Sequence, residues 1–147
     1  MTRTTNVCDN LHMKYLAIDL GDARTGIAIS ESGIIANVLE TYKRVGMQKD
    51  LQYIADLVKN YKIDVVVFGL PLNMDGSEGV RVEKTRSFAD KLQPLIDAKI
   101  DYEDERLTSV EAESFLIEGG MRRDKRKQVI DKLAAVIILQ AYLDRRQ

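Results

Sequence analysis

The sequence predicts an α/β protein built on a mixed five-stranded sheet, with three antiparallel strands, two parallel strands and helices on both faces. Three observations support this prediction. Strand-like runs at 15–20, 25–30 and 34–44 follow one another through short connections, as hairpins do. Later strand-like runs at 64–70 and 99–107 alternate with segments of helical spacing. The run at 64–70, "DVVVFGL", is rich in β-branched residues, which is typical of a strand covered on both faces.

The individual elements follow in chain order. "YLAIDL" (15–20) is expected to be a buried strand, and the turn "GDAR" joins it to "TGIAIS" (25–30). "IIANVLETYKR" (34–44) supplies the third strand, and "KDLQYIADLVKNY" (49–61) is expected to be a helix because its apolar residues recur three and four positions apart. The strand at 64–70 is followed by a helix at 79–96, a strand at 99–107, a helix at 109–120 that stops at a glycine pair, and a final amphipathic helix at 124–146.

Length and composition indicate one globular domain. The chain has 147 residues, 45% hydrophobic and 31% charged, so it can bury a core without disulfides. We expect residues 1–14, which include the only histidine, His12, to be a poorly ordered extension, and 15–147 to be the single domain. A single cysteine, Cys8, fits a reducing cytoplasm, and no apolar run reaches the roughly 18 residues of a membrane span. The net charge of −1 confines any nucleic-acid surface to a local patch.

Acidic residues fall where this topology places a functional site. Asp19 lies inside the first strand, and Asp104 and Glu105 close the last one. Asp131 lies in the final helix, on the side that carries an alanine pair small enough to let the helix approach the sheet. Sites in such sheets lie at the carboxyl ends of the parallel strands, so these carboxylates are expected to meet there.

Carboxylates without cysteine or histidine indicate a hard divalent cation. Mg²⁺ prefers oxygen ligands, and two such ions roughly 4 Å apart can activate water and stabilise the leaving oxygen in phosphodiester hydrolysis. A cation would also explain why Asp19 is tolerated in an apolar run. The alternatives are that Asp19 accepts hydrogen bonds from backbone amides of the turn at Gly21, and that Glu105 and Asp131 are ordinary solvated acids.

A dense basic cluster precedes Asp131 by one or two helical turns. Its members are Arg122, Arg123, Lys125, Arg126 and Lys127. Such a cluster beside an acidic site suits binding to a phosphate backbone. The alternative is an ordinary solvated loop and helix start.

Four motifs resemble those of the YqgF family of ribonuclease H-like proteins. They are "DLGDARTGIA" (19–28), "GLPLNMDGSEG" (69–79), "DERLTS" (104–109) and "DKLAAVIILQAYL" (131–143). The resemblance covers residues 15–143, in the family's order and spacing. Members of the family are described as Holliday-junction resolvases and as pre-16S rRNA nucleases.

The resemblance implies a ribonuclease H-like fold and a set of site residues. The family's acids fall on Asp19, on the acids of "DER" and on Asp131. Glu105 is chosen from the second group and Asp104 is held in reserve, since alternation places the two on opposite faces and the sequence alone does not decide between them. Arg24 and Arg106 match family arginines beside these acids and can hold phosphate. The loop "GLPLNMDG" matches a family loop that is expected to shape the substrate cleft.

The leading interpretation is a Mg²⁺- or Mn²⁺-dependent nuclease that trims the 5′ end of structured pre-16S rRNA in ribosome biogenesis. The closest alternative is a Holliday-junction resolvase acting on branched DNA, which usually needs two symmetry-related sites and therefore a homodimer. A non-catalytic nucleic-acid-binding factor is a second alternative. A kinase of the actin-like superfold ranks low, because the chain has no second copy of the first motif.

Overall fold

The mixed sheet predicted from the sequence is confirmed by the structure. The computed structural model describes residues 13–73, 75–106 and 117–146, apart from the side chains at 127 and 131. Within these residues the sheet has the strand order β3-β2-β1-β4-β5, in which β1, β4 and β5 are parallel and β2 is antiparallel to both of its neighbours. The strands are β1 (Tyr15–Leu20), β2 (Arg24–Ser30), β3 (Asn37–Lys43), β4 (Val65–Leu70) and β5 (Lys99–Asp104).

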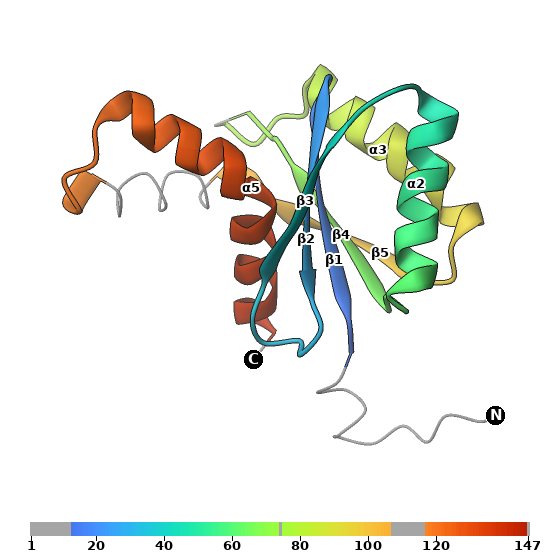
Figure 1. Ribbon diagram of the computed structural model, residues 1–147. Coiled ribbons are helices and arrows are strands. Elements are labelled where there is room, and N and C mark those ends of the chain that lie inside the picture. The colour runs from blue at the N-terminus through green and yellow to red at the C-terminus, as the bar shows by residue number, and fades with distance from the viewer. Residues whose placement is uncertain (1–12, 74, 107–116, 147) are drawn as a thin grey trace.

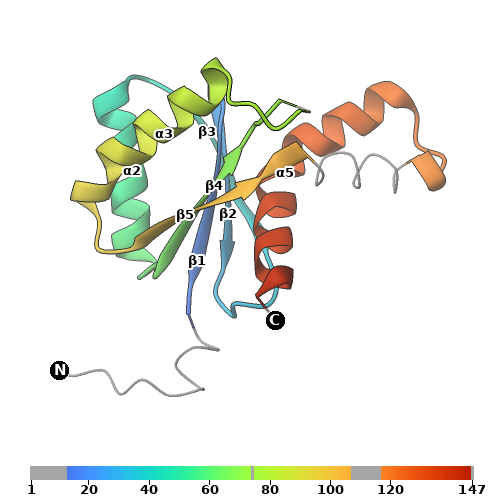
Figure 2. The same cartoon turned by 180° about the vertical axis from the view of Figure 1, so that it is seen from behind.

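Helices cover both faces of this sheet, as Figures 1 and 2 show. They are α2 (Met47–Asn60), α3 (Val80–Leu92), the short 3₁₀ helix η1 (Gln93–Leu95) and α5 (Arg123–Arg145). Alternation along β1 sends successive side chains to opposite faces. Leu16 and Ile18 pack under α2 and α3, whereas Ala17 lies under α5.

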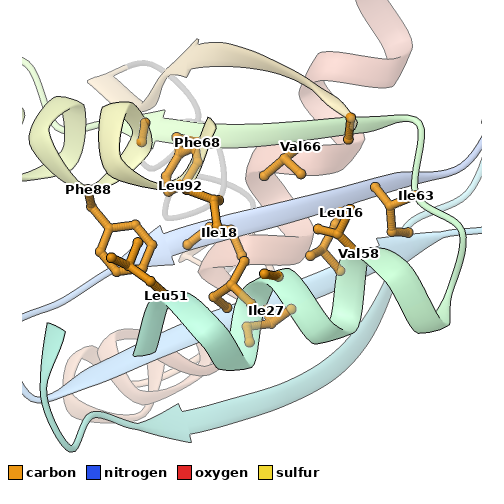
Figure 3. Close-up of a cluster of buried hydrophobic side chains, with 14 of the residues drawn as sticks. Leu16, Ile18, Ile27, Leu51, Val58, Ile63, Val66, Phe68, Phe88 and Leu92 are labelled. Carbon is orange, nitrogen blue, oxygen red and sulfur yellow. The ribbon is translucent and has the colours of Figure 1, made fainter. Parts of the chain in front are cut away.

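The face under α2 and α3 holds the larger apolar core. Figure 3 shows how side chains of the central strands meet those of the two helices. Phe68 of β4 and Phe88 of α3 are both almost fully buried, and their rings meet edge to face with centroids 6.0 Å apart. Burial of side chains this large stabilises the fold by roughly 2–3 kcal/mol each, so α3 is firmly seated on the sheet.

Small residues bring α5 close to the opposite face. Ala17 and Ala28 present only methyl groups there, and Ala135 of α5 is buried against them. A Cβ atom built on Gly26 of β2 would lie 3.6 Å from the Cβ of Ala135, which is ordinary contact distance. The alanine pair predicted to allow close approach therefore does so at Ala135.

Three boundaries differ from the sequence prediction by three residues or more. Strand β3 begins at Asn37 and not at 34, and Ile34 and Ile35 before it are half exposed. The helix expected over 79–96 ends at Leu92, because Pro94 forces the next turn into the 3₁₀ helix η1. Strand β5 ends at Asp104 and not at 107.

Some expectations fall outside the described residues. The extension at 1–12, with His12, is outside them, and so is most of the helix expected at 109–120. Met13 and Lys14 are described: Met13 packs against the α5-side core, and the Lys14 amide donates to Asp64 Oδ2 at 2.8 Å. No helix in the described part of the chain is both long enough and apolar enough to cross a membrane.

Candidate active site

Two carboxyl groups meet at the carboxyl edge of the sheet. Asp19 is the last but one residue of β1 and shares the α5-facing side with Ala17. Glu105 comes directly after β5, where residues 105 and 106 are helical. Because β1, β4 and β5 are parallel, their carboxyl ends share one edge, and two chain segments far apart in sequence converge there.

Glu105 and Asp19 interact directly. Burial, the negative charge of Asp19 and a hydrogen bond between the two side chains together raise the pKa of Glu105 to about 7. The positive charge of Arg81, in the first turn of α3, acts in the opposite direction on the same carboxyl group. Two like charges held together favour a shared proton, and a divalent cation in place of that proton would neutralise both carboxylates.

Gly69 of β4 makes room for this pair. A Cβ atom at Gly69 would lie 2.9 Å from the carboxyl carbon of Glu105 and 2.6 Å from Cδ1 of Ile138 on α5. Only a residue without a side chain therefore leaves the Glu105 carboxyl group where it is. Sequence reasoning did not single out Gly69, although a glycine inside a strand run is a recognised signal of close approach.

Asp104, the reserve acid, points to the other face. It pairs with Arg106 at 2.8 Å, and its Oδ1 accepts the Arg106 backbone N–H at 2.9 Å. The latter bond caps the helical segment that starts at Glu105, which explains why β5 stops three residues early. The Arg106 side chain also lowers the pKa of Asp104 below its ordinary value. The structure thus brings Glu105, and not Asp104, to Asp19.

Arg106 connects β5 to the loop after β4. The charge of Asp75 in that loop acts on the Arg106 guanidinium, together with Asp104. The loop itself is closed by the Gly76 N–H, which donates to the Asn73 carbonyl at 2.8 Å. The loop expected to shape the cleft therefore lies beside the acidic edge, held through Arg106.

The positions of Asp131 and Arg24 follow from the backbone of α5 and β2. Asp131 belongs to α5, one helical turn before Ala135, the residue that covers Gly26. Gly26 pairs with Asp19 in the sheet, so this turn of α5 leads toward the acidic edge. The Asp131 side chain lies outside the described residues. Arg24, the first residue of β2, is exposed and shares the α5-facing side with Gly26.

The basic cluster lies at the start of α5, whose first turns extend away from the sheet (Figures 1 and 2). Arg122, Arg123 and Lys125 are exposed, and Arg126 is half-buried and donates to the Met121 carbonyl at 2.7 Å. The Lys127 side chain lies outside the described residues. Twelve residues of helix separate Arg123 from Ala135, which is about 18 Å. The cluster is therefore distant from the Asp19–Glu105 pair along the helix.

Two acids that sequence reasoning missed are more deeply buried than Asp19. Asp50 of α2 accepts hydrogen bonds from the Tyr42 hydroxyl, the Arg44 side chain and the Val45 amide at 2.9–3.0 Å. Arg44 also donates to the Gly21 carbonyl at 3.0 Å, so this network holds the turn that follows Asp19. Glu103 of β5 pairs with Arg145 of α5. Neither Asp50 nor Glu103 lies in an apolar run, so the sequence contains no comparable signal.

Comparison with known proteins assigns the sequence to a family. The family model described as "RuvX: Holliday junction resolvase" matches residues 13–145. The chain belongs to the RuvX family. RuvX and YqgF denote the same family, so the resemblance of the four motifs is confirmed.

Relatives of this RuvX chain share almost half of its residues. A protein of Caldanaerobacter subterraneus subsp. tengcongensis is 48% identical over 134 residues, 90% of this chain and 96% of the relative. One of Halalkalibacterium halodurans is 46% identical over 138 residues, 92% of this chain and 99% of the relative. Both are named "Putative pre-16S rRNA nuclease".

Solved structures show the same fold. Thermus thermophilus RuvC in complex with a Holliday junction substrate has a TM-score of 0.61 at 12% identity, covering 92% of this chain and 96% of RuvC. A second Thermus thermophilus RuvC structure has a TM-score of 0.58 and covers 91% of this chain and 96% of RuvC. The ribonuclease H-like fold expected of the chain is thus confirmed.

The donor set suits a hard divalent cation. Residues 13–147 contain no histidine and no cysteine, so oxygen atoms are the strong ligands that this part of the chain offers. Among the described side chains, no group of three or more His, Cys, Asp or Glu residues is placed to hold a metal ion. The described part of the site is the Asp19–Glu105 pair, and α5 carries Asp131 toward the same edge.

Proposed function

We propose that this protein is a cytoplasmic metal-dependent nuclease that hydrolyses a phosphodiester bond near the 5′ end of pre-16S rRNA. The observation that carries the proposal is the direct interaction of Asp19 and Glu105 at the carboxyl edge of the sheet. Two half-buried carboxyl groups held together serve no evident structural purpose, because their repulsion opposes folding. The relatives' name, pre-16S rRNA nuclease, supports the choice of substrate.

Asp19, Glu105 and Asp131 are the proposed ligands of Mg²⁺ or Mn²⁺. When bound, the metal supplies a water nucleophile and neutralises charge on the scissile phosphate. Asp19 and Glu105 must lose their shared proton first, and the charge of Arg81 favours that loss. The basic cluster of α5 and Arg24 and Arg106 are proposed to hold the nucleic-acid backbone on either side of the acids.

A Holliday-junction resolvase is the second candidate, because the matching family model carries that description. A resolvase cuts two strands at symmetry-related positions, so it needs two copies of this site in a homodimer. Cleavage of a single strand of pre-16S rRNA needs only one copy of the site. Substrate preference and oligomeric state therefore distinguish the two candidates.

The test is cleavage by the purified protein with Mg²⁺ or Mn²⁺, offered a pre-16S rRNA 5′ leader and a four-way DNA junction side by side. We expect metal-dependent cleavage of the rRNA leader. Glu105→Gln and Asp131→Asn should each lower the rate by about 10²-fold or more, because each removes a ligand charge while keeping size and shape. Melting temperature and metal-free RNA binding should be kept or should rise, because each change also removes repulsion among the acids.

Asp144→Asn provides the matched control on α5. Asp144 accepts a hydrogen bond from Gln140 at the far end of the same helix, so this change should leave the rate unaltered. Preferential cutting of the junction would favour the resolvase. RNA binding without cleavage of either substrate under any metal would contradict the nuclease proposal and favour a non-catalytic binding factor.

A further inference from the structure

A cleft lies beside the acidic edge, on the opposite face of the sheet. It has a volume of about 430 Å³ and opens between the end of β1 and the first turns of α2 and α3. Its apolar lining includes Leu20, Met47, Val80 and Phe88. Val80 is 66% exposed and Met47 38% exposed, so apolar surface is available to a ligand there. The volume falls within the range of about 300–1,000 Å³ typical of small-ligand pockets.

A small basic hollow adjoins this cleft. It holds about 20 Å³ and shares four residues with the cleft, including Lys84 and Arg44, and adds Gly21 and Arg81. Arg81 is exposed, and its side chain makes no hydrogen bond or ion pair with the described residues. Its positive charge lowers the pKa of Glu105, so Arg81 lies near the acidic pair and also lines the hollow.

The charges of the hollow favour an anion. Arg44 is already neutralised by buried Asp50 at 2.9 Å, which leaves Arg81 and Lys84 as the available positive charges. Lys84 contacts Asp22 at 3.2 Å, but both side chains are largely exposed, and such a pair is weak. A phosphate group can therefore displace Asp22 from Lys84 at little cost.

We propose that this cleft binds the nucleotide next to the scissile phosphate, with the adjoining phosphate group on Arg81 and Lys84 and the base or sugar against the apolar lining. The proposal rests on the proposed function, since it takes the Asp19–Glu105 pair as the point of cleavage. Arg81 and Lys84 lie on the first turns of α3, three residues apart and on one side of the helix. An RNA strand that extends from the Asp19–Glu105 pair past Arg81 therefore reaches the cleft.

The same geometry predicts opposite changes in RNA affinity when the cations Arg81 and Lys84 are neutralised and when the neighbouring anion Asp22 is neutralised. Neutralising Arg81 and Lys84 removes the two cations that would hold phosphate, and weakens binding. Neutralising Asp22 removes a carboxylate that competes with phosphate for Lys84, and strengthens binding. A rise in affinity cannot result from damage to the fold, so Asp22→Asn guards the test against misfolding.

The experiment measures binding of a short single-stranded RNA in EDTA, as a function of KCl concentration. Arg81→Gln with Lys84→Gln should lower affinity about tenfold at low salt. The slope of log affinity against log salt should shrink by about 0.7, because the two cations hold one phosphate group and each single-strand phosphate that is no longer neutralised reduces the slope by about that amount. The matched control neutralises Lys59 and Lys91, which lie in the last turns of α2 and α3 at the other end of the sheet. That control should keep the wild-type slope.

Two results would overturn the proposed nucleotide-binding cleft. Unchanged affinity and slope in the Arg81–Lys84 variant, or an equal loss in the Lys59–Lys91 control, would overturn it. Metal-dependent cleavage by the wild type in the same preparation would then leave the proposed function standing. If the wild type neither binds nor cleaves RNA, both proposals fail together. Weaker binding by Asp22→Asn would also count against the cleft.

Discussion

Gly69 is the residue on which the geometry of the acidic pair most directly depends. Gly69→Ala places a methyl group 2.9 Å from the carboxyl carbon of Glu105, so that side chain must move away. We expect cleavage to fall by about 10²-fold, the order of loss that a misplacement of about 1 Å can produce. Stability should fall by only about 1–3 kcal/mol, because the other close atom is the flexible end of Ile138.

Gly26→Ala is the control for that prediction. A Cβ atom at Gly26 meets Ala135 and Asp19 at 3.6–3.7 Å, which is ordinary contact. Cleavage rate and thermal melting of the two variants are compared in one assay. If Gly69→Ala retains full activity, or if Gly26→Ala loses as much, the steric account of the site is wrong.

The sequence singled out an acid as a candidate site residue only where its neighbours in the chain are unusual for an acid. Asp19 stands out because its neighbours in the chain are apolar, and it is half-buried as expected of an acid at a strand end. The choice of Glu105 over Asp104 depends on strand alternation and on where β5 ends. The sequence does not determine that end, because it is set by the hydrogen bond between Asp104 and the Arg106 amide. Asp50 is buried among partners at positions 42, 44 and 45, and Glu103 against the distant Arg145. Neither acid lies in an apolar run, so neither stands out in the sequence.

At the scale of elements, Asp50 joins α2, β3 and the β1–β2 turn. Burial alone raises its pKa, but hydrogen bonds from Val45, Arg44 and Tyr42 lower it below the ordinary value. A lowered folded-state pKa means that its contribution to stability is present above the unfolded pKa and is lost as pH falls through the folded one. The carboxylate therefore stabilises the fold at neutral pH.

Asp50→Asn should lower the free energy of unfolding by about 2–4 kcal/mol, because it leaves the Arg44 charge half-buried without a partner. The deficit against wild type should narrow as pH falls, since wild-type Asp50 is then protonated too. Urea denaturation at several pH values measures both effects. Asp56→Asn on the exposed side of α2 should change stability by less than about 0.5 kcal/mol. An equal effect of the two substitutions would show that the network contributes nothing.

The order and type of the described elements followed from periodicity, whereas the course of α5 did not. Apolar spacing predicted a final amphipathic helix, and the alanine pair predicted its close approach to the sheet. The sequence does not indicate that the first turns of α5, with Arg122 and Arg123, extend away from the sheet (Figure 1). Apolar spacing predicts that these residues are helical, but it does not record where along the helix the contact with the sheet begins.

For the whole molecule, metal binding should appear as thermal stabilisation. Asp19 and Glu105 oppose each other in the metal-free fold, and a cation that binds only the folded state stabilises it by mass action, about 1.4 kcal/mol at tenfold Kd. A chain of this size should then melt a few degrees higher. Because burial and Asp19 raise the pKa of Glu105, Mn²⁺ must displace a proton at low pH, so the shift in melting temperature should be larger at about pH 8 than at about pH 6.

Melting with and without Mn²⁺ measures this shift in melting temperature. Glu105→Gln should abolish it and Asp104→Asn should keep it, because Asp104 pairs with Arg106 instead. A shift that persists in Glu105→Gln, or that does not depend on pH, would place the cation elsewhere on the protein.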